Sequence, residues 1–279
     1  FHNNSNTFDY YIWSELYPKT TGYINLGTEW TSSVTTDSSS LGFYETTPAS
    51  YIKISSSLPA DNKYKKSLGQ VSNLDLDFVR GNTVEFWFNR GATSGSKEVL
   101  FDVWNSDASS SAGYGRLVFY VDDSASNGDL LYVHFASGTV SHTASFTATG
   151  LSSSINAWHH YAVSAKSDGT DTTLKFYVDG VYSTSSVATA KSISQVTGNS
   201  IATIGALATA FTADTLGPND DISAAGWGRV SGSFDEFRFW KEVRNAKQIG
   251  LHWNSHVHGG ANSLQSGSAA LGFYYKFNE

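Results

Sequence analysis

Gly232-Ser-Phe-Asp-Glu-Phe-Arg-Phe-Trp240 is the stretch that decides the fold of this chain of 279 residues. Aromatic and polar residues alternate along it, as expected of a β-strand with one buried face. The following segment contains Asn245, which can accept a hydrogen bond from a first-turn amide, and Gln248, which completes a capping-box pair. We therefore predict a strand that leads into one short helix near the C-terminus.

Further strands are expected at short intervals from Leu41 onward. In the segment 82–89, the alternation places Val84, Phe86 and Phe88 on one face. The other expected strands are 98–104, 115–121, 129–135, 158–164, 173–178, 200–205 and 270–278. Many short strands joined by turns predict an all-β sandwich in which alternate residues are buried.

Turn dipeptides connect several of these strands. Asn127-Gly128 is a strong hairpin signal between two of them. Asp179-Gly180 closes a tight turn because two residues at positive φ are needed there. Asp122 to Asp129 superficially resembles a calcium loop, but it lacks the required ligand spacing and is interpreted as a hairpin turn.

Composition excludes several classes of protein. The net charge of -7 argues against a surface that follows nucleic-acid phosphates. The absence of cysteine excludes disulfides, thiol nucleophiles and thiolate metal sites. No apolar stretch is long enough to span a bilayer, so membrane insertion is not expected.

Two parts are expected along the chain. Residues 1–40 are interpreted as an N-terminal arm or edge strand and a linker, because the polar, low-complexity stretch 31–40 follows an aromatic segment that stops at Pro18. Residues 41–279 form the sandwich domain. A chain without methionine that begins at Phe1 is expected to be a processed product, an excised domain or the ordered part of something longer.

Three segments in this order resemble the LamG-like family, the laminin G and pentraxin-like branch of the concanavalin A-like jelly rolls. They are Trp158-His-His-Tyr-Ala-Val163, Leu174-Lys-Phe-Tyr-Val-Asp-Gly-Val181 and the strand 232–240. The resemblance covers roughly residues 75 to 250. It implies a two-sheet antiparallel jelly-roll sandwich with binding loops at a rim. Since such domains mostly recognise surfaces and glycans, it also implies a non-catalytic recognition module.

A second resemblance concerns the setting of the domain. Lys97 to Asn105, Tyr114-Gly-Arg116 and Tyr274 to Glu279 are similar to segments of bacteriophage virion structural proteins. This resemblance implies a place in a phage tail, fibre or decoration protein, or in a larger extracellular protein. The expected location is extracellular or at the virion surface, and the expected partners are a glycan or cell-surface ligand and other domains of the virion or of the same protein.

Glycoside hydrolysis is the least expected alternative. Laminarinase-type relatives carry two glutamates around an aspartate on one alternating strand, because nucleophile and acid face the sugar from one side. Asp75-Leu-Asp77 lacks both glutamates, and no such pattern occurs elsewhere. No Gly-x-Ser-x-Gly elbow marks a serine nucleophile either. We therefore expect no enzyme and assign no catalytic residue.

Calcium is the one cofactor that the sequence suggests. Pentraxin-like members bind it just after a strand that ends in Ile-Gly, but Ile204-Gly205 is followed here by no carboxylate. The acidic loop 214–221 is a candidate, because Ca²⁺ prefers several oxygen ligands in a flexible cage. Its candidate ligands are Asp214, Asn219, Asp220 and Asp221. The alternative is a solvated loop in which these residues only form turns.

Histidines and aromatic residues are the other candidates. His252, His256 and His258 have a spacing that zinc sites use, but surface histidines are the better interpretation. Of His159 and His160, one is expected to face the core and the other solvent.

Trp104, Tyr114 and Trp227 lie next to predicted loops and are the candidate ligand-binding residues, because exposed rings stack on the apolar faces of sugars. The alternative for each ring is that it fills the core. The alternative for the whole chain is a purely structural virion or filament subunit that makes protein contacts.

Overall fold

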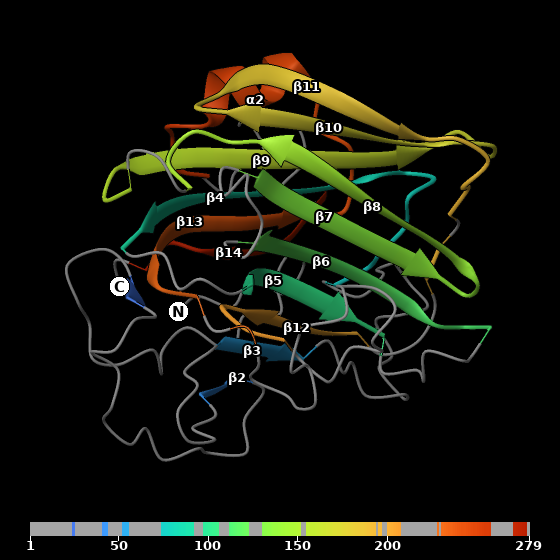
Figure 1. The fold of residues 1–279 in the computed structure, drawn as a ribbon, viewed down its shortest axis with the longest axis horizontal. Coiled ribbons are helices and arrows are strands. Elements are labelled where there is room, and N and C mark those ends of the chain that lie inside the picture. The colour runs from blue at the N-terminus through green and yellow to red at the C-terminus, as the bar shows by residue number, and fades with distance from the viewer. Residues whose placement is uncertain are drawn as a thin grey trace.

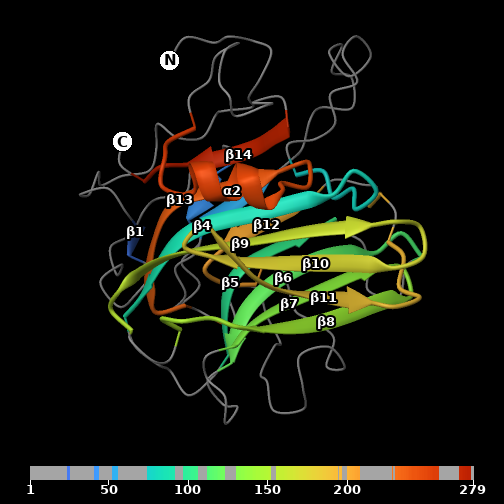
Figure 2. The ribbon, with the colours of Figure 1, turned by 90° about the horizontal axis from the view of Figure 1, so that it is seen from above.

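The computed structural model describes the main part of the sandwich. The described residues are 74–91, 97–105, 112–122, 130–151, 155–193, 195–196, 200–207, 228, 230–257 and 270–277, together with three short strands nearer the N-terminus. Two antiparallel sheets stack face to face, as Figures 1 and 2 show. The predicted all-β jelly-roll sandwich with a short helix near the C-terminus is confirmed.

The first sheet is built around the stretch quoted above. Its strand order is β1 (Ile24–Asn25), β13 (Gly232–Trp240), β4 (Asn82–Arg90), β9 (Trp158–Ser167), β10 (Thr172–Val178) and β11 (Val181–Ala188), and β14 (Leu271–Tyr275) also pairs with β13. The predicted strands of this sheet are confirmed. The pairing of Ile24–Asn25 with β13 adds a short strand from the N-terminal part of the chain.

The second sheet contains the remaining strands. Its order is β2 (Leu41–Phe43), β3 (Ile52–Ser55), β12 (Ile201–Ile204), β5 (Lys97–Trp104), β6 (Gly115–Asp122), β7 (Leu130–Ser137) and β8 (Val140–Thr147). The sequence did not predict β8. Only Ala144 and Phe146 of that strand are buried, so its hydrophobic alternation is weak.

Aromatic side chains fill the space between the sheets. Val84, Phe86 and Phe88 of β4 are each 1% exposed, as the alternation predicted. The ring of Phe237 lies 5.1 Å from that of Phe86 and 5.2 Å from that of Phe101 in the opposite sheet, measured between ring centroids. The core thus contains many aromatic rings among aliphatic side chains, and stacked and tilted ring pairs stabilise it beyond their buried area.

The helix α2 (Ala246–His252) lies on the outer side of the first sheet (Figure 2). Asn245 is its N-cap and accepts a hydrogen bond from the backbone N–H of Gln248 at 2.9 Å, and Gln248 accepts one from Asn245 N–H at 2.9 Å. The predicted capping box is therefore confirmed. On the buried side of the helix, Ile249 packs against Ala162 and Tyr177 of the sheet.

A tight turn also positions the chain segment that follows α2. Asp179 and Gly180 have φ angles of 48° and 77°, as the turn between β10 and β11 requires. A Cβ at Gly180 would lie 2.3 Å from Cδ1 of Trp253, so only glycine allows the turn to touch that ring. In the described residues, no helix is long and apolar enough to cross a membrane.

Candidate functional site

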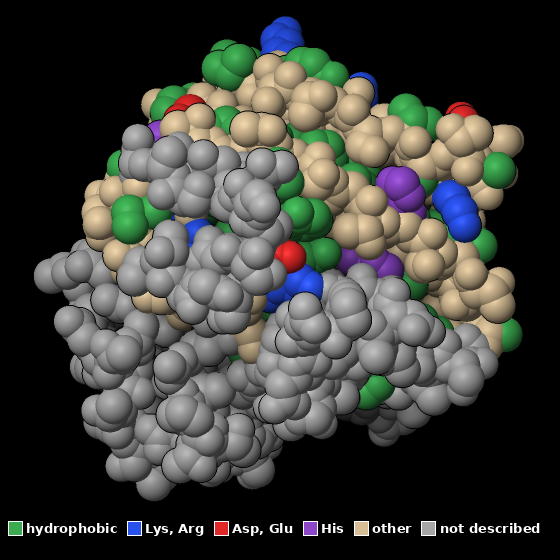
Figure 3. Space-filling model, in the orientation of Figure 1, with side chains coloured by type: hydrophobic (Ala, Val, Ile, Leu, Met, Phe, Trp, Pro, Cys, Tyr) green, Lys and Arg blue, Asp and Glu red, His purple; other side chains and the backbone are tan. Residues whose placement is uncertain are grey.

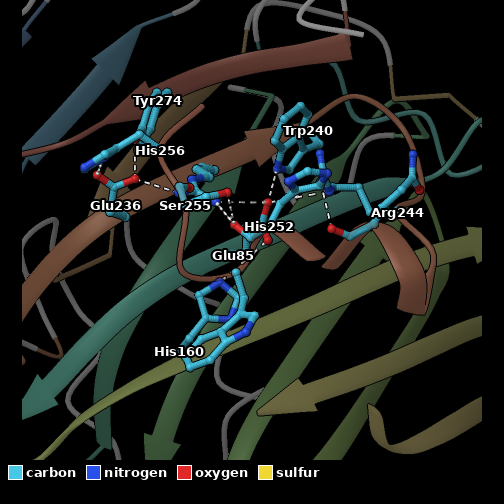
Figure 4. A network of polar contacts seen from close by, with 12 residues as sticks. Glu85, His160, Glu236, Trp240, Arg244, His252, Ser255, His256 and Tyr274 are labelled. Carbon is cyan, nitrogen blue, oxygen red and sulfur yellow. Dashed lines mark hydrogen bonds and ion pairs between the residues drawn. The ribbon is translucent and has the colours of Figure 1, made fainter. Parts of the chain in front are cut away.

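A buried polar cluster lies on the outer face of the first sheet, beneath α2. Glu85 of β4 is 1% exposed and faces outward because Phe86 next to it faces the core. Arg244 Nε lies 3.7 Å from one Glu85 oxygen and His160 Nε2 lies 3.6 Å from the other. Arg238 Nη1 is 4.0 Å away, and the Trp240 indole N–H donates a hydrogen bond to Glu85 (Figure 4). We call these five residues the Glu85 cluster.

The charge of Glu85 stabilises this cluster. Burial by itself would raise the pKa of the carboxyl, but His160, Arg238 and Arg244 outweigh it and lower the pKa to about 2. The contacts of Arg244 and Arg238, at 3.7 and 4.0 Å, are longer than hydrogen bonds, so the two arginines act mainly through charge. Glu85 is therefore ionised at neutral pH and holds two buried arginines against β4.

Next to this cluster, β13 contains a bulge at its acidic pair. The pairing of β13 with β4 shifts register between Asp235 and Arg238, and Glu236 has a φ of 50°. That conformation is strained for a residue with a side chain, and such strain and bulges are common beside functional sites. The bulge turns the Glu236 carboxylate toward the outer surface, where three side chains hold it.

The partners of Glu236 come from three places in the chain. Arg238 Nη2 donates a hydrogen bond to Oε2 at 2.6 Å, and His256 Nδ1 lies 2.7 Å from Oε1. The Tyr274 hydroxyl of β14 donates to Oε2 (Figure 4). Burial and the neighbouring carboxylate raise the pKa of Tyr274, which keeps its hydroxyl protonated as a donor. Glu236 therefore joins β13, β14 and the segment after α2.

A pocket of about 270 Å³ opens beside the bulge. It is lined by Trp87, Trp158, Asp235, Glu236, Arg238, Asn254, Ser255 and His256. Trp87 and Trp158 are half-buried, so part of each ring is accessible. The Trp87 ring stacks on Trp253 with 5.2 Å between centroids, and its indole N–H donates to the Trp253 carbonyl at 3.2 Å. These contacts hold one aromatic wall of the pocket in place.

Asp235 supplies an acidic group with an unusual protonation equilibrium. Burial, together with the charge of Glu236, raises the pKa of its carboxyl to about 7, although a hydrogen bond from the Glu236 N–H opposes both. The guanidinium of Arg238 is already engaged: Nη2 contacts Glu236 and the Ser255 carbonyl at 2.5 Å, and Nη1 contacts the His252 carbonyl at 3.2 Å. The pocket thus combines aromatic walls with hydrogen-bond acceptors.

The aromatic residues predicted from the sequence lie elsewhere. Trp104 ends β5 in the second sheet and pairs across the strands with Arg116, whose guanidinium binds Asp102 at 2.5 Å. Tyr114 is 8% exposed and its hydroxyl contacts Arg116, so the expected surface position of this ring is wrong. Tyr114 is buried because it packs beside this ion pair. The predicted role of Trp104 in ligand binding stays a prediction.

The remaining predicted site residues lie outside the described part of the chain. They are Asp214, Asn219, Asp220, Asp221 and Trp227. The proposed calcium site therefore stays a prediction. Within the described ranges, no group of three His, Asp or Glu side chains is arranged to hold a metal ion.

The histidines occupy three different settings. His256 has a side chain 54% exposed and contacts Glu236, which confirms a surface position, whereas His258 lies outside the described residues. His159 is 19% exposed and contacts Asp179 at 2.9 Å. His160 is buried, but beneath α2 next to Trp87 rather than between the sheets. The expectation that one of the two histidines faces the core and the other solvent is therefore corrected. His160 faces the outer side of the sheet and is still buried, because α2 covers that side at this point.

Sequence reasoning missed the pocket, although one signal pointed to it. Phe234 and Phe237 are both fully buried in the core, and their spacing of three residues breaks the two-residue period of the strand. Such a break requires an extra residue at Asp235 and Glu236, which is the observed bulge. Nothing in the sequence marks Trp87, Trp158 or Asn254 as neighbours of that bulge, because they come from separate segments.

Comparisons with known proteins agree with this architecture. A family described as the concanavalin A-like lectin/glucanases superfamily matches residues 64–250. No curated protein matches the chain.

Several solved structures are similar to this chain at low sequence identity. They include a SAP-like pentraxin from Limulus polyphemus, with 15% identity over 63% of this chain and 70% of that chain and a TM-score of 0.40. A Bacteroides ovatus protein provisionally assigned to carbohydrate binding has 16% identity over 72% of this chain and 48% of its own, with a TM-score of 0.45. The CBM40 of a Ruminococcus gnavus IT-sialidase, bound to α2,3 sialyllactose, has 12% identity over 62% of this chain and 82% of its own, with a TM-score of 0.43.

The family match covers more than half of the chain, and its ends lie close to those of the LamG-like resemblance, roughly residues 75 to 250. The described strands form the two antiparallel layers that this family requires. The chain therefore belongs to the concanavalin A-like lectin/glucanases superfamily, in its LamG-like branch.

Proposed function

We propose that this chain is a non-catalytic recognition module that binds a neutral glycan in the pocket between Trp87 and Trp158. The observation that carries the proposal is the combination of two partly accessible indole rings with the acceptor groups of Asp235 and Asn254 in one pocket. Indole faces stack on the apolar faces of sugar rings. Carboxylate and amide oxygens accept hydrogen bonds from sugar hydroxyls.

The charges of the pocket support a neutral ligand over an anionic one. Asp235 and Glu236 are both acidic, and the nearest cation, Arg238, is 1% exposed and already bound to Glu236 and to two backbone carbonyls. An anionic sugar placed between the tryptophans would face two carboxyl groups without a cation that is free to bind it. A hydroxyl-rich neutral sugar meets no such repulsion.

A glycan array followed by calorimetric titration tests the proposal. We expect Trp158→Ala to weaken binding of the best neutral glycan by about tenfold or more, since loss of a stacking ring costs roughly 1.4 kcal/mol or more. Trp104→Ala is the matched control, because it removes the same side chain from a strand end in the second sheet. Both variants are compared with the wild type by thermal unfolding.

The possible results separate two sites. If Trp104→Ala abolishes binding and Trp158→Ala does not, the ligand binds at the second sheet, as the sequence predicted, and the proposed pocket is wrong. If no glycan binds in the presence or absence of Ca²⁺, the recognition proposal itself fails. The Ca²⁺ arm also examines the acidic loop: an increase in Tm that Asp220→Ala abolishes would support a calcium site there.

We further propose that the module acts at an extracellular or virion surface as part of a larger protein. Support comes from the LamG-like sequence segments and from the resemblance of three other segments to virion proteins. Mass spectrometry of purified virions and of culture supernatant from the source would locate the protein. Recovery only from washed cytosol would contradict this setting.

A further inference from the structure

Strand β4 carries an uncharged polar side chain on its outer face, beside the candidate pocket. Phe88 is buried in the core, so Asn89 next to it faces outward, as Trp87 does. Ser233 of β13 pairs directly with Asn89, and Asn89 pairs with Trp158 of β9. Residues directly opposite each other on antiparallel strands share a face of the sheet. Ser233, Asn89 and Trp158 therefore form one row across three strands, which we call the Asn89 row.

The Asn89 row lies immediately next to the residues that line the pocket. Asp235 pairs with Trp87 across the strands, and both line the pocket. Two residues along a strand correspond to about 7 Å, so the Asn89 row lies one such step from this pair, a step comparable with one unit of a sugar chain. Trp158 belongs to both places, because it lines the pocket and also ends the Asn89 row. The pocket and the row are therefore parts of one continuous surface.

The polar groups of the row are open to a ligand. Asn89 and Ser233 are half-buried, and within the described part of the chain neither side chain makes a hydrogen bond or an ion pair. An amide and a hydroxyl group can each donate and accept, as sugar hydroxyl groups do. Charged side chains are few over the described part of the face in Figure 3, so lack of charge alone does not mark a site. The position of the row beside an aromatic pocket distinguishes it.

The residues beyond the row, at the end of β4, leave the surface low. Gly91 has no side chain, and a Cβ there would meet only the carbonyl oxygen and Oγ of Ser231, both at 3.9 Å. Asn156 is exposed on the other side of β4, where its backbone N–H donates to the Arg90 carbonyl at 2.8 Å. Among the described residues, this end of the surface thus holds only small or uncharged polar groups. A chain that leaves the pocket over the Asn89 row can continue past it.

We infer that the ligand is a linear neutral oligosaccharide rather than a single sugar, with one unit in the pocket and the next unit over Asn89 and Ser233. This inference rests on the glycan function proposed above for the pocket. The first unit stacks on the tryptophans, and the second exchanges hydrogen bonds with the Asn89 amide and the Ser233 hydroxyl. Because the second contact needs a second unit, it adds affinity only for chains.

Calorimetric titration with linear chains of glucose, mannose or xylose, from the single sugar to short oligosaccharides, tests the inference. We expect the affinity of the best-bound series to rise by about tenfold or more from the single sugar to the longer chains, which corresponds to roughly 1.4 kcal/mol. Asn89→Ala and Ser233→Ala should each reduce this gain and leave the affinity for the single sugar unchanged. Ser185→Ala is the matched control for Ser233→Ala, because Ser185 is exposed on β11, at the far side of the same sheet.

A measurement on the wild type makes the test independent of any variant. In saturation-transfer NMR, protons of the second sugar unit should receive saturation as those of the first do; thermal unfolding checks that each variant is folded. Equal affinity for single sugars and chains, or a gain that both alanine variants leave intact, overturns the inference, and the proposed pocket still stands if Trp158→Ala weakens binding. If no sugar of any length binds, or if Trp158→Ala leaves binding unchanged, the proposed function fails and this inference fails with it.

Discussion

Replacing Glu85 with glutamine removes the carboxylate that faces Arg238 and Arg244 beneath α2. The glutamine side chain has nearly the same volume, so the change tests charge rather than packing. The ordinary pKa of 4.5 and the folded pKa of about 2 differ by about 2.5, and at 1.36 kcal/mol for each pKa unit the ionised form contributes about 3 kcal/mol. Removing one partner of a buried ion pair typically costs about 3–5 kcal/mol, which agrees with this value.

The sign of the pH dependence follows from the lowered pKa. Because the folded pKa lies below the unfolded one, the contribution of Glu85 is fully present above pH 4.5 and is lost as the pH falls toward about 2. Urea unfolding followed by tryptophan fluorescence would measure the free energy of unfolding of both proteins across this range. We expect Glu85→Gln to be about 3–5 kcal/mol less stable at neutral pH, with a difference that shrinks in acid.

Glu242→Gln is the matched control, since burial raises the pKa of Glu242 and the charge of Arg244 only partly opposes it. A raised carboxyl pKa gives the opposite trend: this glutamate lowers the stability of the wild type as the pH rises above 4.5. The reasoning about Glu85 would be refuted by a loss below about 1 kcal/mol at neutral pH, the upper range for exposed pairs. A difference between wild type and Glu85→Gln that does not change with pH would refute it equally.

Three further predictions concern the turn, the helix and the pocket. Gly180→Ala should lower the free energy of unfolding by more than Gly169→Ala, because both have positive φ but only the Cβ at 180 would meet a Trp ring, at 2.3 Å; equal losses in urea would remove the steric argument. Asn245→Ala should cost about 1 kcal/mol in the same assay through loss of the capping box, and an unchanged midpoint would show that the cap contributes nothing. In the wild type, glycan affinity should rise with pH around the Asp235 carboxyl pKa of about 7, since the ionised form accepts hydrogen bonds from hydroxyl groups better, and Asp235→Asn should abolish this rise. The raised pKa also makes the folded wild type lose stability as the pH rises from 3.8 through about 7. Asp235→Asn should remove this loss as well. Calorimetric titration at both sides of that pH checks the affinity, and a variant that keeps the rise would assign it to another group.

Sequence alone predicted the strands whose hydrophobic pattern is strong. β4 and β13 carry large aromatic residues that face the core, so their period was easy to recognise. β8 was missed because only Ala144 and Phe146 among its residues are buried, and it becomes a strand through pairing with β7 along its whole length. That pairing depends on tertiary contacts, which the local strand preferences of the residues do not predict.

The candidate site was less predictable, because it depends on contacts between distant segments. A glutamate at position 85 in an alternating strand is normally interpreted as solvent-facing, and α2 covers it only in the folded chain. Its partners His160 and Arg244 belong to β9 and to the residues just before α2. Asp235 and Glu236 are adjacent acidic residues of β13, and their bulge conformation follows from the need to bury both Phe234 and Phe237.

The position of β13 in the first sheet has a consequence for how the molecule is made. β13 lies between β4 on one side and β1 and β14 on the other, and Trp240 reaches Glu85 across 155 residues of chain. During synthesis β4 must therefore wait, with one flank open, until the chain as far as Trp240 has left the ribosome. Pairing over such separations is slow and exposes nascent strands to aggregation. A fragment that stops before Gly232 would lack the middle of this layer, so any shortened version for expression has to retain it.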